Sequence, residues 1–500
     1  MKKLVLLGLG ITFSVTLFAQ NTFTSNNATP GTDFNNVANW TGTGTPNFSN
    51  GLDVFIIRDG DSYTATSNLN IKTLTLGQGG AGGALTLPAG TATLDLEGNM
   101  IFEVNSTLTA NDNQVNIAGN WTVNSGASFS STGTVIFDAA LVQTISTDAT
   151  FNNLTFSGGG VVTTGGDVSV NGSWLITNNT TFSTGDTHTL SGDITVDDGS
   201  VYNATDGILT LNGSVDQAMN IGSNATFDRI YFNPGAAINI NVTGDLVAND
   251  LTLVYPNATL NGSGDHSFQG LRQEGTCNFT GSITFTGGTV YDNDDNAFSL
   301  GTADITISGS VNFSSGDDNI TVGGNLTVDG NYLVLNEGSV TGSGGTLQVN
   351  SGNTLYVRGV DNFPTGFGLV VFEDNTARAN YDMAGNQTVR GNITYGRLAL
   401  GNSGTKTVDG PLDIDGYLDL NNGISLNLST FNHTLAGDLY NQTDASISQT
   451  GGTFTFDAPD ANQRMEDKGT GTYMFSTLVF TNTAPTAVRT KNIDATNVSV

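Results

Sequence analysis

The stretch GTVIFDAALVQTISTDATFNNLTFSG, residues Gly133 to Gly158, decides the fold that this sequence predicts. It holds short runs in which apolar and polar residues alternate, a Gln-x-Ile step between them, and glycine at both ends. Alternation at period two indicates β-strands with one buried and one solvated face, and glycine clusters indicate turns. The stretch therefore predicts short strands joined by tight turns.

The same pattern recurs along the chain. Gln217, Gln387 and Gln463 take the place of Gln143 in three further copies, the first of which spans Gly207–Phe232. The last apolar residues of the first two copies are 76 residues apart, and those of the last two are 80 apart. A long period divided into shorter strand and turn steps indicates stacked coils rather than one closed core.

Two all-β architectures fit such strands. Asn-Gly and Asp-Gly pairs often close hairpins, which would favour tandem antiparallel β-sandwich repeats as the alternative fold. Here, however, the alternation continues straight through these pairs into another apolar step. That continuity favours corners between the faces of a right-handed parallel β-helix with roughly twenty coils. The pairs are Asn171-Gly172, Asn212-Gly213, Asp329-Gly330 and Asp409-Gly410.

The inward-facing positions are predicted from the same alternation. Leucine and β-branched residues two positions apart are expected to stack on their neighbours one coil away. These pairs are Val168/Val170, Ile194/Val196, Leu209/Leu211, Ile305/Ile307, Leu326/Val328 and Leu347/Val349. Phenylalanines in the same phase are expected inside the coil as well, namely Phe137, Phe156, Phe285, Phe313, Phe456 and Phe480.

Three regions are expected along the chain. Residues 1–19 have the basic start, apolar run and small final residue of a secretory signal peptide. Residues 20–67 differ in pattern and predict an N-terminal cap, with Trp40 as its buried anchor, that protects the first strands. Residues 68–500 predict the β-helix repeat region. Because the sequence stops inside a predicted strand, we expect it to be the front part of a longer protein.

Charge and cysteine content narrow the class of protein. The formal net charge is −30, from 45 acidic and 15 basic residues, which disfavours nucleic acid and anionic lipid as partners. Cys277 is the only cysteine, so the chain has no internal disulfide framework. No later segment is long and apolar enough to predict a membrane span. The sequence therefore predicts a secreted protein that is extracellular or attached to the cell surface.

Two segments carry a resemblance to a known family. Gln143–Gly172 and Gly385–Gly416 resemble the repeat of large, secreted, adhesin-like β-helical surface proteins of Bacteroidota, and Asp33–Trp40 is similar to the opening of many such proteins. The resemblance implies export by the type IX secretion machinery, which would recognise a β-sandwich sorting domain beyond residue 500. It specifies architecture more than activity.

No catalytic site is predicted. A polysaccharide lyase of this shape needs a basic residue close to Ca²⁺-binding acids, but Arg378 lies in a turn-like Ala-Arg-Ala-Asn segment without a dense acidic cluster beside it. His188, His266 and His433 are scattered on strand or turn positions and are expected to be bystanders. The best metal candidates are Asp292, Asp294 and Asp295, because closely spaced carboxylates suit Ca²⁺. No other cofactor is expected.

Two functions remain open on the sequence. The first is a structural and adhesive surface protein that contacts surfaces, glycans or other cells and is handled by a secretion and sorting machinery. The alternative is a carbohydrate-active module that cleaves glycans or binds them with Trp121, Trp174 or tyrosines on an outer face. Exposed aromatic residues in one groove beside an acid–base cluster would favour the second function.

Overall fold

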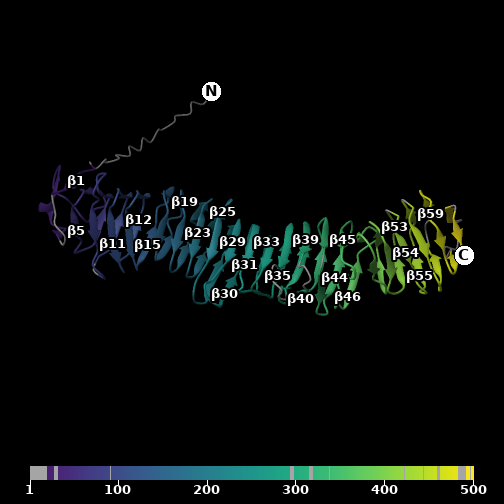
Figure 1. Ribbon diagram of the computed structural model, residues 1–500. Helices are drawn as coiled ribbons and strands as arrows, with labels where there is room; N and C mark the ends of the chain where they lie inside the picture. The colour runs from purple at the N-terminus through teal and green to yellow at the C-terminus, as the bar shows by residue number, and fades with distance from the viewer. Residues whose placement is uncertain are drawn as a thin grey trace, which may run out of the picture. The chain divides into compact units, whose positions relative to one another are not determined.

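The computed structural model describes residues 20–26, 32–90, 92–292, 298–314, 319–336, 338–421, 423–442, 444–458, 462–481, 491–495 and 497–500. The predicted signal peptide lies outside these residues. The chain divides into two compact units, Met1–Gly166 and Asp167–Val500. Both are built from short, mostly parallel strands, in about twenty solenoid turns altogether. Figure 1 shows the strands of each unit lying side by side.

Unit 1 contains three rows of parallel strands, and each turn of the chain adds one strand to each row. In the first row, Leu74, Met100, Trp121 and Ile145 face one another in register, at separations of 26, 21 and 24 residues. The rows are β4 (Val54–Ile57), β7 (Thr73–Leu76), β10 (Met100–Phe102), β13 (Trp121–Val123), β16 (Gln143–Ile145) and β19 (Val161–Thr164); β2 (Thr32–Asp33), β5 (Ser62–Thr64), β8 (Ala84–Thr86), β11 (Thr107–Asn111) and β14 (Ser128–Ser131); and β6 (Leu69–Ile71), β9 (Leu94–Leu96), β12 (Val115–Ile117), β15 (Thr134–Phe137) and β18 (Asn153–Phe156).

The first strands of unit 1 are closed by an aromatic cluster. Strand β1 (Thr22–Ser25) pairs antiparallel with β3 (Trp40–Gly42) and parallel with β4. A short 3₁₀ helix, η1 (Val37–Asn39), precedes β3. Trp40 packs against Phe34, Phe55 and Tyr63, and its Nε1 donates a hydrogen bond to the carbonyl oxygen of Phe34 at 2.8 Å. Trp40 is thus the buried anchor that the sequence predicts, and the boundary near residue 67 stays a prediction.

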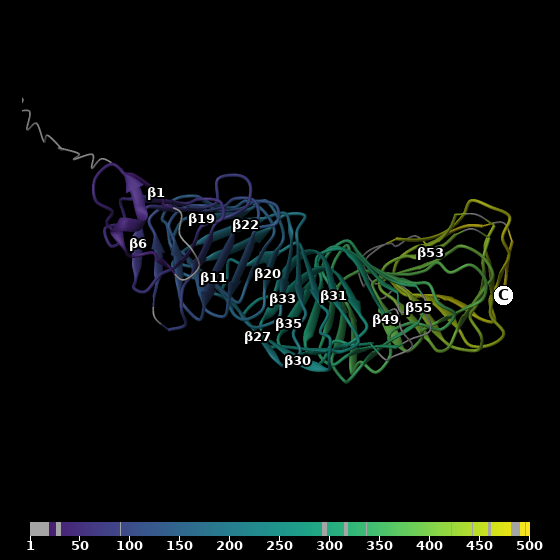
Figure 2. The ribbon, with the colours of Figure 1, turned by 60° about the vertical axis from the view of Figure 1, so that its left-hand side comes forward.

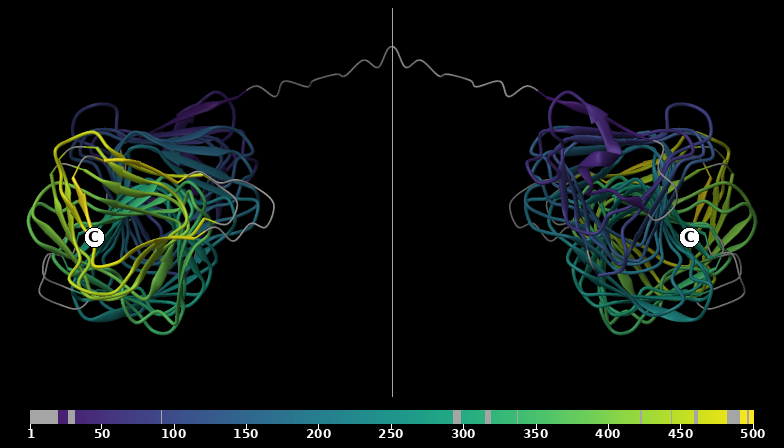
Figure 3. Two further views of the ribbon diagram at one scale, coloured as in Figure 1. Left: turned by 90° about the vertical axis from the view of Figure 1, so that its right-hand side faces the viewer. Right: turned by 90° about the vertical axis from the view of Figure 1, so that its left-hand side faces the viewer.

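Unit 2 continues the same design with longer rows. The row that carries the candidate site contains β36 (Gly288–Asp292), β39 (Ser310–Ser314), β42 (Tyr332–Leu335), β45 (Thr354–Val357), β47 (Arg378–Tyr381), β50 (Arg397–Leu400), β53 (Leu418–Leu420), β56 (Leu439–Asn441) and β59 (Gln463–Asp467). Two further rows accompany its last turns: β48 (Gln387–Val389), β51 (Thr405–Val408), β54 (Ser425–Asn427), β57 (Ser446–Ser448) and β60 (Tyr473–Met474); and β49 (Ile393–Tyr395), β52 (Leu412–Ile414), β55 (His433–Leu435), β58 (Phe454–Phe456) and β61 (Leu478–Phe480). In Figures 2 and 3 these last turns are seen as closed loops around an interior.

One corner of unit 2 is straightened into long strands. Strand β31 (Val247–Val254) pairs with both β28 (Thr226–Phe227) and β29 (Arg229–Phe232), and β33 (Asp265–Gln273) follows it. The register between β31 and β33 shifts between Ala248 and Leu251, as it does at a β-bulge. Two rows therefore join at this point into one broad sheet.

The interior consists of in-register ladders of side chains. One ladder runs through unit 2 with a buried residue from each turn: Leu209, Ile230, Thr252, Leu271, Val290, Phe313, Leu335, Val357, Tyr381, Leu400, Leu420 and Asn441. All the predicted inward pairs are buried. Of the predicted phenylalanines, Phe480 is the exception at 39% exposed, because β61 is the last strand of its row in the described chain.

The Asn-Gly and Asp-Gly pairs are corners, not hairpins. Asn171-Gly172 joins β20 (Val168–Val170) to β21 (Trp174–Ile176), which belong to different rows and stack on different neighbours. Asp409-Gly410 joins β51 to β52 in the same way. The parallel solenoid is therefore the fold of both units, and the sandwich alternative is not.

Candidate functional site

Tyrosine and arginine side chains gather on the outer face of one sheet in unit 2. They alternate with the buried ladder, so the same period that fills the core places them outside. Tyr332, Thr354, Arg378 and Arg397 follow one another in register across β42, β45, β47 and β50. We call the following set the tyrosine–arginine strip: Tyr332, Tyr356, Arg358, Arg378, Arg397, Tyr417, Asp419, Tyr440 and Arg464.

Three arginines of the strip are neutralised by acids. Arg358 forms a bidentate pair with Asp382, with Nε–Oδ1 and Nη2–Oδ2 distances of 3.0 and 3.1 Å. The Nε and Nη2 atoms of Arg397 both lie 2.6 Å from Oδ2 of Asp419. Arg464 lies 2.9 Å from Glu466. The two parallel hydrogen bonds of the Arg358–Asp382 pair add geometric specificity to that contact.

The same three arginines lie over tyrosine rings. The guanidinium carbon of Arg358 is 5.3 Å from the ring centroid of Tyr356, and that of Arg397 is 5.6 Å from Tyr417. Arg464 lies 5.2 Å from Tyr440. Distances below about 6 Å allow cation–π attraction. The strip is therefore an ordered array of flat aromatic and guanidinium groups.

Arg378 differs from the other arginines of the strip. No carboxylate of the described residues lies within ion-pair distance of its guanidinium, and its Nε is buried without a hydrogen-bond partner. Burial and the neighbouring Arg397 lower the pKa of Arg378 from its usual value. The guanidinium of Arg378 is thus half-buried and has no direct acidic partner among the described residues.

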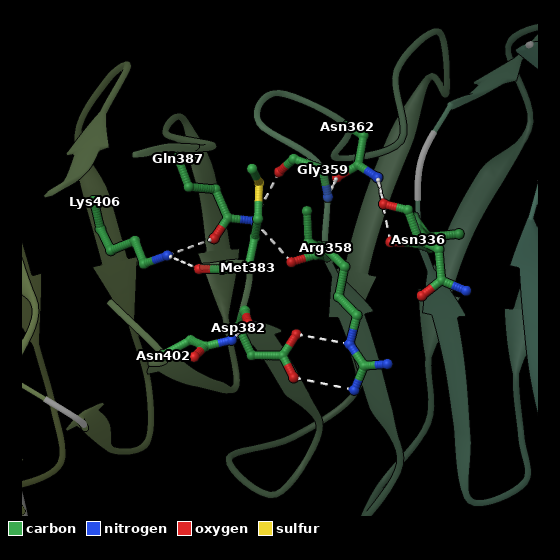
Figure 4. A network of polar contacts seen from close by, with 11 residues as sticks. Asn336, Arg358, Gly359, Asn362, Asp382, Met383, Gln387, Asn402 and Lys406 are labelled. Atoms are coloured by element: carbon green, nitrogen blue, oxygen red, sulfur yellow. Dashed lines mark hydrogen bonds and ion pairs between the residues drawn. The ribbon is translucent and has the colours of Figure 1, made fainter. Parts of the chain in front are cut away.

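Two open hollows adjoin the strip, with volumes of about 540 and 350 Å³. Arg358, Met383 and Ala384 line both hollows, and Asn402 lines the smaller one. Figure 4 shows Arg358 and Asp382 side by side below Met383, with Gln387 and Lys406 on the neighbouring strands. Arg358 thus belongs to the strip and lines both hollows, and its partner Asp382 lines the smaller hollow.

A buried lysine lies close to this site. Lys406 is 0% exposed and takes an inward position in β51, in register with Gln387 and Leu426. Its Nζ donates to the carbonyl oxygens of Met383 and Gly385 and to Oε1 of Gln387, at 2.6, 3.3 and 3.0 Å. Burial lowers the pKa of Lys406 to about 8, against an opposing effect of Asp382. Lys406 therefore fixes a turn below the hollow.

The recurrent glutamine of the sequence repeat is a buried clip between turns. Nε2 of Gln143 donates to the carbonyl oxygens of Ile117 and Gly119, and its Oε1 accepts from the amide of Ala139. Gln217 and Gln463 make the same three bonds with their own neighbours. In Gln387 the ammonium of Lys406 replaces the amide donor. Burial of an amide requires such partners, and these glutamines are structural.

The three histidines are clips as well. Nδ1 of His188, His266 and His433 accepts a hydrogen bond from a backbone amide of the preceding turn, at 3.0, 3.2 and 3.0 Å. An accepting Nδ1 places the proton of the neutral ring on Nε2. Burial lowers the pKa of His188 and of His266 to about 4, and also lowers that of His433. The three rings are structural parts of the interior.

The predicted metal site falls outside what can be described. Asp294 and Asp295 lie outside the described residues, and Asp292 ends strand β36 with its side chain not described. In the described part of the chain, no group of three or more His, Cys, Asp or Glu side chains is arranged to hold a metal ion. The Ca²⁺ site thus stays a prediction.

Two sequence-based placements are wrong. Trp121 and Trp174 are each 1% exposed, because both begin strands on an inward position, opposite Met100 and Ile194 respectively. Neither can bind a glycan on an outer face. The segment that contains Arg378 is strand β47 and not a turn. The alternation of Ala377, Ala379 and Tyr381 with the polar residues between them is the feature of the sequence that indicates this strand.

The chain was compared with protein-family models, curated proteins and solved structures. No protein-family model, no curated protein and no solved structure matches it. In the described residues, no helix is long and apolar enough to cross a membrane. The fold and the site therefore define the class: a parallel β-solenoid that presents a tyrosine–arginine strip on one outer face.

Proposed function

We infer that this protein is a secreted structural and adhesive solenoid that makes contact with extracellular surfaces, glycans or other cells. The observation that carries this proposal is that the inward and outward side chains of the strands have different roles. Inward histidines and glutamines serve as backbone clips, whereas the ordered outward tyrosines and arginines form a surface array. A surface of this kind suits contact over several coils.

The proposed location and relationship come from the sequence. The signal-like residues 1–19, the acidic surface and the repeat resemblance support export to the cell surface in a bacterium of the Bacteroidota by type IX secretion. We propose that the protein acts by contact rather than by catalysis, and that Ca²⁺ is the one cofactor it could bind. Sorting machinery and extracellular glycans are the proposed partners, and nucleic acid is not.

Adhesion and export test the proposal directly. Beads coated with the purified chain should adhere to glycan-coated surfaces, while polysaccharides incubated with the same protein should show no new reducing or unsaturated ends. In the native organism, protease added to intact cells should remove the protein from the cell surface. A variant that lacks residues 1–19 should stay inside the cell. Adhesion no better than that of uncoated beads, or release of sugar fragments, would contradict the proposal.

A further inference from the structure

Arg378 is the one arginine of the strip that lacks an acidic partner in the described residues. The acids nearest to it in the sheet are engaged, since Asp419 binds Arg397 and Asp382 binds Arg358. Asp419 is also almost buried, with 7% of its side chain exposed, and so cannot move readily to Arg378. Both carboxylates act on Arg378 only beyond ion-pair distance, so its guanidinium has no direct acidic partner within the described chain.

The geometry of Arg378 suits a planar or tetrahedral oxyanion. A guanidinium offers a fork of N–H donors that matches a carboxylate or a sulfate with two parallel hydrogen bonds. In-register pairing places Arg397 on the next strand, at a spacing of about 4.8 Å, where its charge acts on Arg378 and is opposed by that of its partner Asp419. An anion at Arg378 would relieve the repulsion between the two arginines.

Half-exposed tyrosines flank Arg378 on both sides along the sheet. Tyr332 and Tyr356 lie edge to face, with ring centroids 5.6 Å apart, on the strands before β47. Tyr417 and Tyr440 follow on the other side with centroids 5.5 Å apart. From Tyr356 to Tyr440 the strip covers four strand steps, roughly 19 Å. An arginine lies over the rings of Tyr356, Tyr417 and Tyr440, and the part of each ring that stays exposed can pack against the C–H face of a sugar.

The net charge of the chain disfavours some anionic partners more than others. A chain of net charge −30 repels a densely charged polyanion, and the other strip arginines are already neutralised. One free guanidinium between two pairs of tyrosines fits one acidic group between neutral sugar rings. We propose that the strip binds a saccharide chain of mainly neutral sugars, whose isolated carboxylate or sulfate is held by Arg378. This inference rests on the proposed function and specifies its ligand.

The test compares three probes on the purified chain. These are a xylo-oligosaccharide that bears one glucuronic acid, its carboxyl-reduced counterpart and a counterpart with one sulfate ester. Calorimetry should show the acidic probes binding at least about tenfold more tightly than the reduced one, as a charge-assisted bidentate contact provides. The ratio between the two acidic probes distinguishes carboxylate from sulfate, and higher salt should reduce the advantage.

Variants locate the contact. R378Q should reduce the affinity for the acidic probes to that for the neutral probe. The control R390Q makes the same change of charge at an exposed arginine outside the strip, and should leave the affinity for the acidic probes unchanged. Y417S removes a ring that is 40% exposed, and should weaken all three probes without affecting the fold. Far-ultraviolet circular dichroism checks that R378Q is folded.

Each remaining outcome overturns a defined claim. Equal affinity for the acidic and reduced probes, or R378Q binding like the unaltered protein, refutes the role of Arg378, while adhesion to glycan surfaces would still support the proposed function. Tighter binding of an acidic peptide than of any saccharide probe refutes the sugar assignment. Loss of adhesion together with failure of all three probes refutes both proposals.

Discussion

At the scale of single residues, polar groups in the interior are used to connect one turn of the chain to the next. Gln143 satisfies two carbonyl oxygens and one amide through a single side chain. His188, His266 and His433 do the same for one amide each. Buried polar groups without hydrogen-bond partners are costly. These side chains therefore supply partners to backbone carbonyl and amide groups that lie at corners, where the strand ladders do not pair all of them.

Replacing Gln143 by leucine should destabilise its turn. The change leaves the carbonyl oxygen of Gly119 and the amide of Ala139 without partners, at roughly 1–3 kcal/mol for each unsatisfied group, whereas the carbonyl oxygen of Ile117 still accepts from the amide of Asp138. Hydrogen exchange should show faster exchange at Ala139 and its neighbours. Gln78→Leu alters an exposed glutamine of the same unit and serves as the control. Unchanged protection in Q143L would show that the clip contributes nothing.

Acid should destabilise unit 2 through its histidines. An unfolded histidine binds a proton below about pH 6.5, whereas His188 and His266 resist protonation in the fold until about pH 4. The contribution of each histidine to the free energy of unfolding is therefore fully present above pH 6.5. It is lost as the pH decreases toward 4, by roughly 3 kcal/mol for each histidine. Urea unfolding followed at several pH values measures the loss.

A histidine variant separates this effect from carboxylate titration. His188→Asn keeps a side-chain acceptor for the amide of Val168 but cannot take up a proton. Its urea midpoint should fall less between pH 6.5 and 4 than that of the unaltered protein. Parallel curves for the two proteins would show that His188 does not cause the loss.

At the scale of elements, strand alternation places Lys406 inside although its type favours the surface. Its neighbours in register along the sheet include Leu426 and Ile447, so β51 supplies a cation where β54 and β57 supply apolar groups. Three neutral oxygens solvate the ammonium in place of water. The cost of its burial is reflected in the lowered pKa.

This burial predicts an increase in stability in alkaline solution. In the unfolded chain the pKa of lysine is near 10.5, whereas in the fold that of Lys406 is about 8. Between these values the unfolded state binds the proton more tightly, so the free energy of unfolding should increase as the pH rises from 8 to 10.5. The variant K406M, compared with K468M at an exposed lysine, should lose this increase. An identical slope in K406M and K468M would contradict the assignment.

At the scale of the whole molecule, each unit depends on turn-to-turn register rather than on one closed core. Residues that face each other are about one turn apart in sequence, as Leu398 and Leu418 are. Stacked repeats of this kind tolerate the loss of a complete repeat, because the neighbours on both sides present equivalent surfaces. A partial repeat shifts inward residues to the outside.

Deletion of one complete turn should therefore be tolerated. Removing residues 399–418 places Leu398 in the position of Leu418, so that Asp419 follows directly and the ladder continues. The protein should stay soluble and resist proteolysis, whereas removal of residues 399–408 alone should give rapid cleavage in unit 2. Equal resistance of the two deletions would show that register does not control stability here.

Alternation in the sequence predicted the strands, the buried ladders, the corners and the parallel solenoid, because the period of a strand decides which side of it faces the core. It did not predict the division at Gly166, the burial of Trp121 and Trp174, or the strip around Arg378. Those features depend on which residues meet across turns, and partners in adjacent turns lie about twenty residues apart with loops of variable length between them. Whether an outward arginine finds an acid is decided only when the turns are stacked.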